Sequence, residues 1–186
     1  MRGLVLMALA AWLAATCSPA QAGTPLPSCA VPGYQQVYVP GPGVFSGGLQ
    51  SETDLQRLHE QMGVQHIIDL RPADAEGAEP ESAIAQRLGV SYQRIAIADR
   101  TDLTPEHARM LHRALQDHAG EPVLVHCVTG KRAAALLTLR AVWEQGQPPD
   151  DAIAHGRRMG LDTAEPVVAE LLGLPVAQAT TAVAAH

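Results

Sequence analysis

The sequence is poor in aromatic residues, in cysteine and in basic runs. Only 3% of the 186 residues are aromatic, three are Cys, and the formal net charge is −6. Proteins that bind nucleic acid or anionic membranes present clustered Lys and Arg, so we expect no nucleic-acid partner and no polybasic membrane contact. Three cysteines cannot form a disulfide scaffold. The sequence contains no Cys-x-x-Cys and no histidine pair at metal-ligand spacing, so we expect neither a metal site nor a cofactor.

Long apolar runs are also scarce, and the clearest one lies near the N-terminus. Leu4–Ala15 is apolar and follows Arg2, but it is too short to span a bilayer comfortably. Ala20–Ala22 fits the small-x-small rule for signal-peptide cleavage. We therefore expect residues 1–22 to be a signal peptide, and the mature chain to be periplasmic or secreted without stable membrane insertion. An uncleaved anchor, or lipidation at Cys17, is the alternative.

Three segments follow this leader. Residues 23–43 are rich in Pro and Gly and are expected to form an irregular arm, in which Gln36–Val39 is a candidate edge strand. Residues 44–174 carry the regular pattern of one α/β domain, long enough to bury a substantial core. Residues 175–186 are rich in Ala and Thr and are expected to be a flexible tail.

Apolar strand-like runs and amphipathic helices alternate through residues 44–174. The expected strands are Val44–Ser46, Val64–Leu70, Val90–Ile97 and Val123–His126, and helices are expected after Ser51, at Glu81–Leu88, from Pro105, from about Arg132, from Pro148 and at Glu165–Leu172. This alternation predicts a three-layer α/β fold, in which a mostly parallel sheet lies between helices. Ligands of such sheets bind beyond the carboxyl ends of the strands, where Asp69–Arg71, Ala98–Leu103 and Cys127 should meet.

The segment from Val123 to Arg132 carries the strongest chemical pattern. A buried strand is followed by a short loop, Cys127–Lys131, and then by helix-forming sequence. Backbone N–H groups at a helix N-terminus favour an anion, and the same field lowers the pKa of a thiol, so Cys127 is the expected nucleophile. Arg132 offers a bidentate donor for phosphate or sulfate, and Gly130 allows the backbone to approach an anion closely.

The heptapeptide His126–Arg132, His-Cys-Val-Thr-Gly-Lys-Arg, resembles the signature loop of the cysteine-dependent tyrosine and dual-specificity phosphatases. The arginine follows the cysteine by one position fewer than is usual there, and Ala133 stands where Ser or Thr often follows. The shorter spacing resembles the bacterial beta-lactamase hydrolase-like phosphatase family. The similarity extends over about Val44–Leu172 and includes Phe45–Leu49, Ile67–Pro72 and Leu103–Pro105.

This resemblance implies a cysteine-phosphatase-like fold and hydrolysis of phosphomonoesters through a phosphocysteine, without a metal or cofactor. Cys127 would attack phosphorus, and His126 would support the loop. The phosphate would be held by Arg132 and by the backbone of the loop residues Val128, Thr129, Gly130 and Lys131. The partner would be a phosphorylated protein or a phosphorylated small molecule. Few aromatic residues are available to line a deep phosphotyrosine pocket.

The leaving oxygen needs a proton, which an Asp on a nearby loop usually supplies. Asp99 and Asp102 are the candidates, and Asp102 is preferred because it lies just before the expected helix cap. Arg71 has two interpretations: it pairs with Asp69 at the end of a strand, or it lines the anion pocket. Lys131 either recruits an anionic substrate or is simply solvated.

Three other interpretations fit the same loop. Rhodanese-like sulfurtransferases also place a reactive Cys in a short loop between a strand and a helix. A non-catalytic domain that binds phosphorylated ligands is compatible with Ala133 and with the uncertain acid. The third reading makes Cys127 a buried structural residue and Arg132 an ordinary first-turn residue.

After cleavage of the leader, Cys29 and Cys127 would be the two remaining cysteines. A low-pKa thiol in an oxidising compartment is prone to oxidation. We therefore consider that Cys29, on a flexible arm, forms a reversible disulfide that masks Cys127, or else that Cys29 is incidental.

Overall fold

The computed structural model describes residues 29–72, 74–75 and 78–175. The expected signal peptide, the first part of the arm and nearly all of the expected tail lie outside the described residues. Within the described residues, no helix is both long and apolar enough to cross a membrane.

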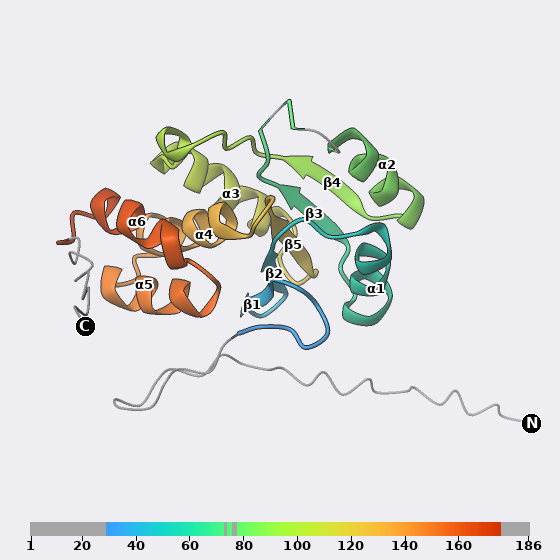
Figure 1. Ribbon diagram of the computed structural model, residues 1–186, viewed down its shortest axis with the longest axis horizontal. Helices are drawn as coiled ribbons and strands as arrows, with labels where there is room; N and C mark the ends of the chain where they lie inside the picture. The colour runs from blue at the N-terminus through green and yellow to red at the C-terminus, as the bar shows by residue number, and fades with distance from the viewer. Residues whose placement is uncertain (1–28, 73, 76–77, 176–186) are drawn as a thin grey trace, which may run out of the picture.

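One five-stranded sheet organises the fold (Figure 1). Its strands are β1 Val37–Gly41, β2 Val44–Gly47, β3 His66–Asp69, β4 Ser91–Arg94 and β5 Val123–His126, in the order β1-β2-β5-β3-β4. β2, β5, β3 and β4 run parallel, and β1 pairs with β2 antiparallel. The predicted mostly parallel sheet is confirmed. The central position of β5 sets the carboxyl end of β5 between those of β2 and β3.

The helices cover both faces of the sheet, as the alternation predicted (Figure 1). They are α1 Glu52–Met62, α2 Ala78–Leu88, α3 Pro105–Asp117, α4 Lys131–Trp143, α5 Pro149–Arg158 and α6 Glu165–Leu171, with 3₁₀ turns η1 Arg100–Asp102 and η2 Asp162–Ala164. Helices α1 and α2 lie on one side of the sheet, and α3 to α6 lie on the other. The Ser51 and Thr104 side chains cap α1 and α3 as expected.

Successive side chains of the strands point to opposite faces of the sheet and pack into two hydrophobic cores, one on each face. Val123 and Val125 of β5 pack with α3 and α4, whereas Leu124 faces the other way and packs with Leu55 and Leu58 of α1. β5 is therefore apolar along its whole length because both of its faces are buried.

The largest differences from the predicted bounds lie in three segments. The arm over residues 23–43 is not irregular throughout, since β1 forms at the predicted edge and Ala30 pairs with Tyr38. Helix α2 starts at Ala78, three residues before Glu81. Strand β4 ends at Arg94, although the chain beyond it stays against β3, where the Ile95 N–H donates to the Asp69 carbonyl (2.9 Å).

Candidate active site

The loop after β5 is held by the chain that follows β2. The Cys127 N–H donates to the Gly47 carbonyl (3.2 Å), and the Leu49 N–H donates to the Val128 carbonyl (3.0 Å). Gly48 and Thr129 form an isolated antiparallel bridge. The loop is therefore fixed along one side by residues from the neighbouring strand, which lie about eighty positions earlier in the chain.

Glycine is required where these two segments meet. Gly130 has φ +81°, in the left-handed region, and a Cβ there would lie 3.2 Å from the Gly47 carbonyl carbon. A Cβ on Gly48 would lie 2.7 Å from Gln36 Oε1 and 3.1 Å from the Val128 carbonyl oxygen. The close packing of the two backbones explains why both segments carry glycine.

Helix α4 begins at Lys131, directly after this loop, as predicted. Its N-cap is Gly130, so no side chain caps the first turn of the helix. The N-terminal amides and the dipole of a helix favour an anion at this position. Cys127 carries a free thiol at the start of the loop. It is fully buried, whereas the adjacent Val128 is 48% exposed.

The side chain of Arg132 lies across the carboxyl edge of the sheet. Its Nη1 donates to the Ile97 carbonyl at 2.5 Å, which links the first turn of α4 to the chain after β4. Lys131 points elsewhere: its Nζ donates to Thr163 Oγ1 (2.8 Å) and lies 3.5 Å from an Asp162 carboxylate oxygen. Of these two basic residues, Arg132 is the one that the structure sets between the two loops of the site.

Both candidate acids lie in the loop before α3, as expected, but their environments differ. Asp99 Oδ1 accepts hydrogen bonds from the Thr101 N–H and hydroxyl (2.7 Å each). These bonds hold the pKa of Asp99 below its ordinary value, which disfavours the protonated form that a general acid needs. Asp102 Oδ2 accepts from the Ala98 N–H (2.8 Å) and closes the loop onto itself. Both carboxylates thus accept backbone hydrogen bonds within the same loop, and the preference for Asp102 stays a prediction.

Arg71 and Asp69 form a buried ion pair, so the first of the two interpretations of Arg71 is the one observed. Arg71 Nε lies 3.0 and 2.9 Å from the two Asp69 carboxylate oxygens, and the Tyr92 hydroxyl donates to Asp69 Oδ2 (2.6 Å). Burial alone would raise the pKa of Asp69, but these hydrogen bonds outweigh it and lower the pKa. Arg71 is 1% exposed and supports the site from beneath rather than lining an anion pocket.

Glu81 completes this cluster, and sequence reasoning missed it. It lies at the N-terminal end of α2, is 3% exposed, and accepts a hydrogen bond from Arg71 Nη2. A signal was present: Glu81 precedes Ile84, Ala85 and Leu88 by three, four and seven positions, so it belongs to the apolar stripe of the helix. A carboxylate on that stripe should be buried and should have a specific partner.

Besides Arg71, Glu81 has a second partner, His126, which is the residue before Cys127. His126 Nε2 lies 3.2 Å from Glu81 Oε1, and His126 Nδ1 lies 3.2 Å from the Cys127 carbonyl oxygen. Within the described part of the chain, neither Nε2 nor Oε1 has a hydrogen-bond partner otherwise. One proton on the carboxyl group satisfies both atoms, because the Glu81 O–H then donates to Nε2 while Nδ1–H donates to the Cys127 carbonyl.

The direction of the pKa shifts agrees with this arrangement. Burial raises the pKa of Glu81 to about 7, and burial lowers the pKa of His126 to about 4. Arg71 contacts both carboxylates of the cluster and Arg94 Nε lies 3.7 Å from Asp69 Oδ2, but burial outweighs these cations at Glu81, so the folded protein favours the neutral Glu81–His126 pair below about pH 7. His126 is thus a neutral support of the loop, as the resemblance implied, and Glu81 is a positioning residue for it.

The disulfide considered above is not formed in the structure. Cys127 is a free thiol, so it is not joined to Cys29. Cys29 is also not on a flexible arm: it is buried, and its carbonyl accepts a hydrogen bond from the Val39 N–H (2.8 Å).

Residues 42–165, more than half of the chain, match the sequence model of a family described as a dual-specificity and tyrosine phosphatase (DSP-PTPase) fused to NAD⁺ kinase. The chain belongs to this phosphatase family. The predicted resemblance is thereby confirmed at the level of family and fold. Two beta-lactamase hydrolase-like proteins, from Xylella fastidiosa strains Temecula1 and 9a5c, are each 32% identical over 117 residues, or 61% of this chain. The chain spans only 27% of the length of these curated relatives.

Solved structures show the same phosphatase fold. A DUF442 phosphatase from Shewanella putrefaciens CN-32 is 27% identical, with a TM-score of 0.60 over 76% of this chain and 93% of that one. Pseudomonas aeruginosa TpbA, solved as a variant in complex with phosphotyrosine, is 17% identical, with a TM-score of 0.56 over 76% of this chain and 85% of that one. The second likeness is one of fold alone.

Proposed function

We propose that this protein is an exported, metal-independent cysteine phosphatase that hydrolyses phosphomonoesters through a phosphocysteine intermediate. The observation that carries the proposal is the free Cys127 thiol between β5 and the uncapped N-terminus of α4, in a chain of the phosphatase family. That position favours a thiolate and a bound anion at the same place.

In the first step the Cys127 thiolate attacks phosphorus, and the bond between phosphorus and the leaving oxygen breaks. The leaving oxygen takes a proton from Asp102. Backbone N–H groups from Val128 to Arg132, together with the Arg132 guanidinium, hold the equatorial oxygens and stabilise their charge in the transition state. To do so, Arg132 turns a free edge of its guanidinium toward the phosphate, while the contact with Ile97 anchors it.

In the second step a water molecule attacks the phosphocysteine. Asp102, now a carboxylate, accepts a proton from this water, and the products are inorganic phosphate and the regenerated thiolate. Each proton that leaves Asp102 in the first step thus returns to it in the second. His126 does not exchange protons in either step, because its ring is engaged with the Cys127 carbonyl and faces Glu81.

The substrate class follows from the charge and position of the site. A dianionic phosphate monoester matches the helix N-terminus and Arg132, and the phosphotyrosine bound to TpbA is such a monoester. With the expected signal peptide, the substrate would be an exported phosphorylated protein or a phosphorylated small molecule. N-terminal sequencing of the exported protein tests this part, and a chain that begins at Gly23 is the expected result.

The decisive experiment is hydrolysis of p-nitrophenyl phosphate in the presence of a reductant and EDTA. Cys127→Ser should abolish turnover and keep phosphate binding, and Arg132→Ala should lower kcat/KM by about 10²- to 10³-fold. Arg87→Ala is the matched control, since Arg87 lies in the last turn of α2, is 58% exposed, and its guanidinium pairs with Glu52 of α1.

Two outcomes would refute the proposal: turnover that survives Cys127→Ser, or turnover that EDTA abolishes. If the reduced protein shows no turnover at all, transfer of sulfur from thiosulfate to cyanide tests the sulfurtransferase alternative. Binding of inorganic phosphate without either activity would leave the non-catalytic binder.

A further inference from the structure

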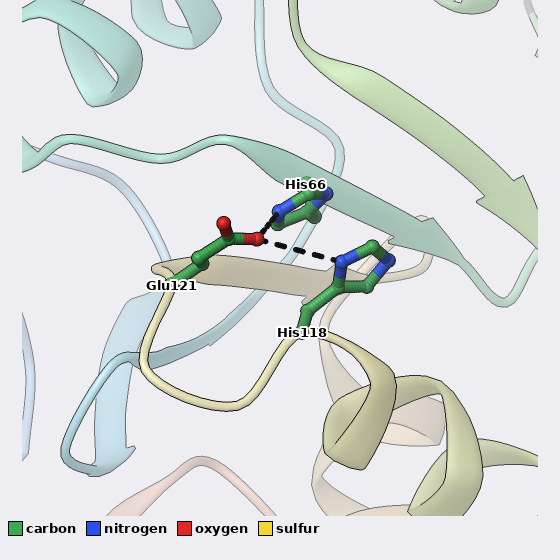
Figure 2. A group of neighbouring side chains, drawn as sticks. All are labelled: His66, His118 and Glu121. Atoms are coloured by element: carbon green, nitrogen blue, oxygen red, sulfur yellow. Dashed lines mark hydrogen bonds and ion pairs between the residues drawn. The ribbon is translucent and has the colours of Figure 1, made fainter.

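Three potential metal ligands converge at the edge of the sheet opposite Cys127 (Figure 2). His66 is the first residue of β3, His118 follows the last turn of α3, and Glu121 lies between α3 and β5. Histidine spacing in the sequence did not reveal this group, because His66 and Glu121 are 55 positions apart. The parallel pairing of β3 with β5 brings them together, with His66 opposite Val123.

The three ligand atoms lie close together. His66 Nε2 is hydrogen-bonded to Glu121 Oε2, and His118 Nδ1 lies 3.6 Å from the same oxygen. The two imidazole rings are stacked, with centroids 3.5 Å apart and an interplanar angle of 21°. One ligand atom from each residue lies within 4.8 Å of the other two. Figure 2 shows both dashed contacts ending on one carboxylate oxygen.

Ser91 adds the outer contact that metal-binding histidines usually have. Its hydroxyl lies 2.5 Å from His66 Nδ1, and β-sheet register holds the two residues opposite each other. A bond from Nδ1–H to Ser91 orients the ring so that Nε2, which is bonded to Glu121 here, is the nitrogen that would coordinate an ion. The orientation of the His66 ring is thus set before any ion binds.

The buried group of Asp69, Glu81 and His126 offers a useful contrast. Its ligand atoms are also close together, but the Arg71 guanidinium already bonds both carboxylates there. Glu121, in contrast, forms its ion pairs in the described part of the chain with the two histidines. Its side chain is 49% exposed, so an ion and a water ligand can reach the site from solvent.

We propose that His66, His118 and Glu121 bind a divalent transition-metal ion of the Zn²⁺ class, with water as a fourth ligand. Two imidazoles and one carboxylate form a donor set that suits Zn²⁺, whereas Mg²⁺ and Ca²⁺ prefer oxygen ligands. On binding, the proton between His66 Nε2 and Glu121 leaves to solvent, and the ion takes its place.

This site is separate from the proposed phosphatase chemistry. Glu121 and Cys127 lie at opposite ends of β5, and a strand rises about 3.3 Å per residue, so about 20 Å separates them. The ion would join β3 to the loop between α3 and β5. Its expected effect is therefore a more stable folded state rather than a change in turnover.

The test uses protein that carries Cys127→Ser, because a thiolate would also bind Zn²⁺. Competition with a chromogenic chelator should show one Zn²⁺ per chain. His118→Ala and His66→Ala should each weaken binding by at least about tenfold, and Ser91→Ala by about tenfold, as for an outer-shell contact. His107→Ala, at the other end of α3, is the matched control and should bind as the parent does. Zn²⁺ should raise the Tm of the parent and leave that of His118→Ala unchanged.

Parent protein that binds no Zn²⁺, or His118→Ala that binds it as tightly as the parent, would overturn the proposal. Since His66 lies in a strand, its variant could be poorly folded. His118 lies in an exposed turn, so its variant provides the decisive comparison, and circular dichroism checks its fold. In protein that retains Cys127, the phosphatase activity of His118→Ala is expected to equal that of the unsubstituted chain. The test of the metal site and the test of the proposed function can therefore fail independently.

Discussion

Replacing Glu81 with Gln should make the protein more stable at neutral pH, although Glu81 contacts Arg71 in the core. The replacement keeps the shape of the side chain. Its carbonyl can accept from Arg71 and its amide N–H can donate to His126 Nε2, as the protonated carboxyl does. The variant therefore removes the titration of Glu81 and leaves the contacts in place.

The magnitude follows from the two pKa values of Glu81. The folded value of about 7 exceeds the ordinary value of 4.5, so between these pH values the folded state holds a proton that the unfolded state has lost. The parent accordingly loses stability as the pH rises through this window. The difference of about 2.5 corresponds to about 3 kcal/mol, at about 1.4 kcal/mol per unit. The variant should match the parent near pH 4.5 and exceed its stability by up to about 3 kcal/mol at pH 7 and above.

The assay is urea unfolding at several pH values, with the free energy of unfolding of the variant compared with that of the parent at each pH. The comparison cancels the contribution of His126, whose lowered pKa is due to burial in both proteins. Glu60→Gln, an exposed residue of α1, is the control and should show no such trend. If Glu81 were instead an ionised partner of Arg71, Glu81→Gln would destabilise the protein at pH 7 and the loss would vanish toward pH 4.5. That opposite slope would refute the reasoning.

Two further predictions concern the loops. Asp102→Asn should lower kcat for an alkyl phosphate by about 10²-fold, and for p-nitrophenyl phosphate by much less, because a nitrophenolate leaves without a proton. Asp99→Asn should change neither kcat. If Asp99→Asn gave the larger loss instead, Asp99 would be the acid. Gly130→Ala should lower the free energy of unfolding by more than the about 1–2 kcal/mol that the left-handed backbone costs alone. Gly146→Ala isolates that backbone cost, since Gly146 has φ +67° and nothing within 4 Å of its Cβ position; equal losses in the two variants would show that the contact of Gly130 with Gly47 is unimportant.

Local patterns in the sequence predicted most of the fold. The apolar run Val123–Val125, the caps Ser51 and Thr104, and the change from strand to helix around Cys127 all depend on neighbours within a few positions, and each was found where expected. The predicted bounds were wrong where the structure of a segment depends on a partner that is distant in the sequence. The edge strand expected at Gln36–Val39 extends to Gly41, where β1 pairs with β2, and strand β4 ends early although the chain beyond it stays bonded to β3.

The candidate site divides in the same way. The loop of Cys127 and the first turn of α4 are contiguous in sequence, so their approximate geometry could be predicted. Glu81 could not be assigned to His126 in this way, because their contact depends on how α2 packs under the sheet. Arg71 was left with two interpretations for the same reason: only the packed structure shows that Asp69 and Glu81 both contact its guanidinium.

The charge state of this buried cluster also determines which groups could supply a positive electrostatic potential at Cys127. A charged His126 directly before the cysteine would stabilise a thiolate, but burial lowers the pKa of His126 to about 4, so the ring is neutral at physiological pH. The remaining sources are the N-terminal amides of α4 and the guanidinium of Arg132, both on the side of the loop where a phosphate would bind. A phosphate that binds there would use the same donors that favour the thiolate. With His126 neutral, the proposed mechanism rests on the N-terminal amides of α4 and on Arg132 rather than on the histidine that precedes Cys127.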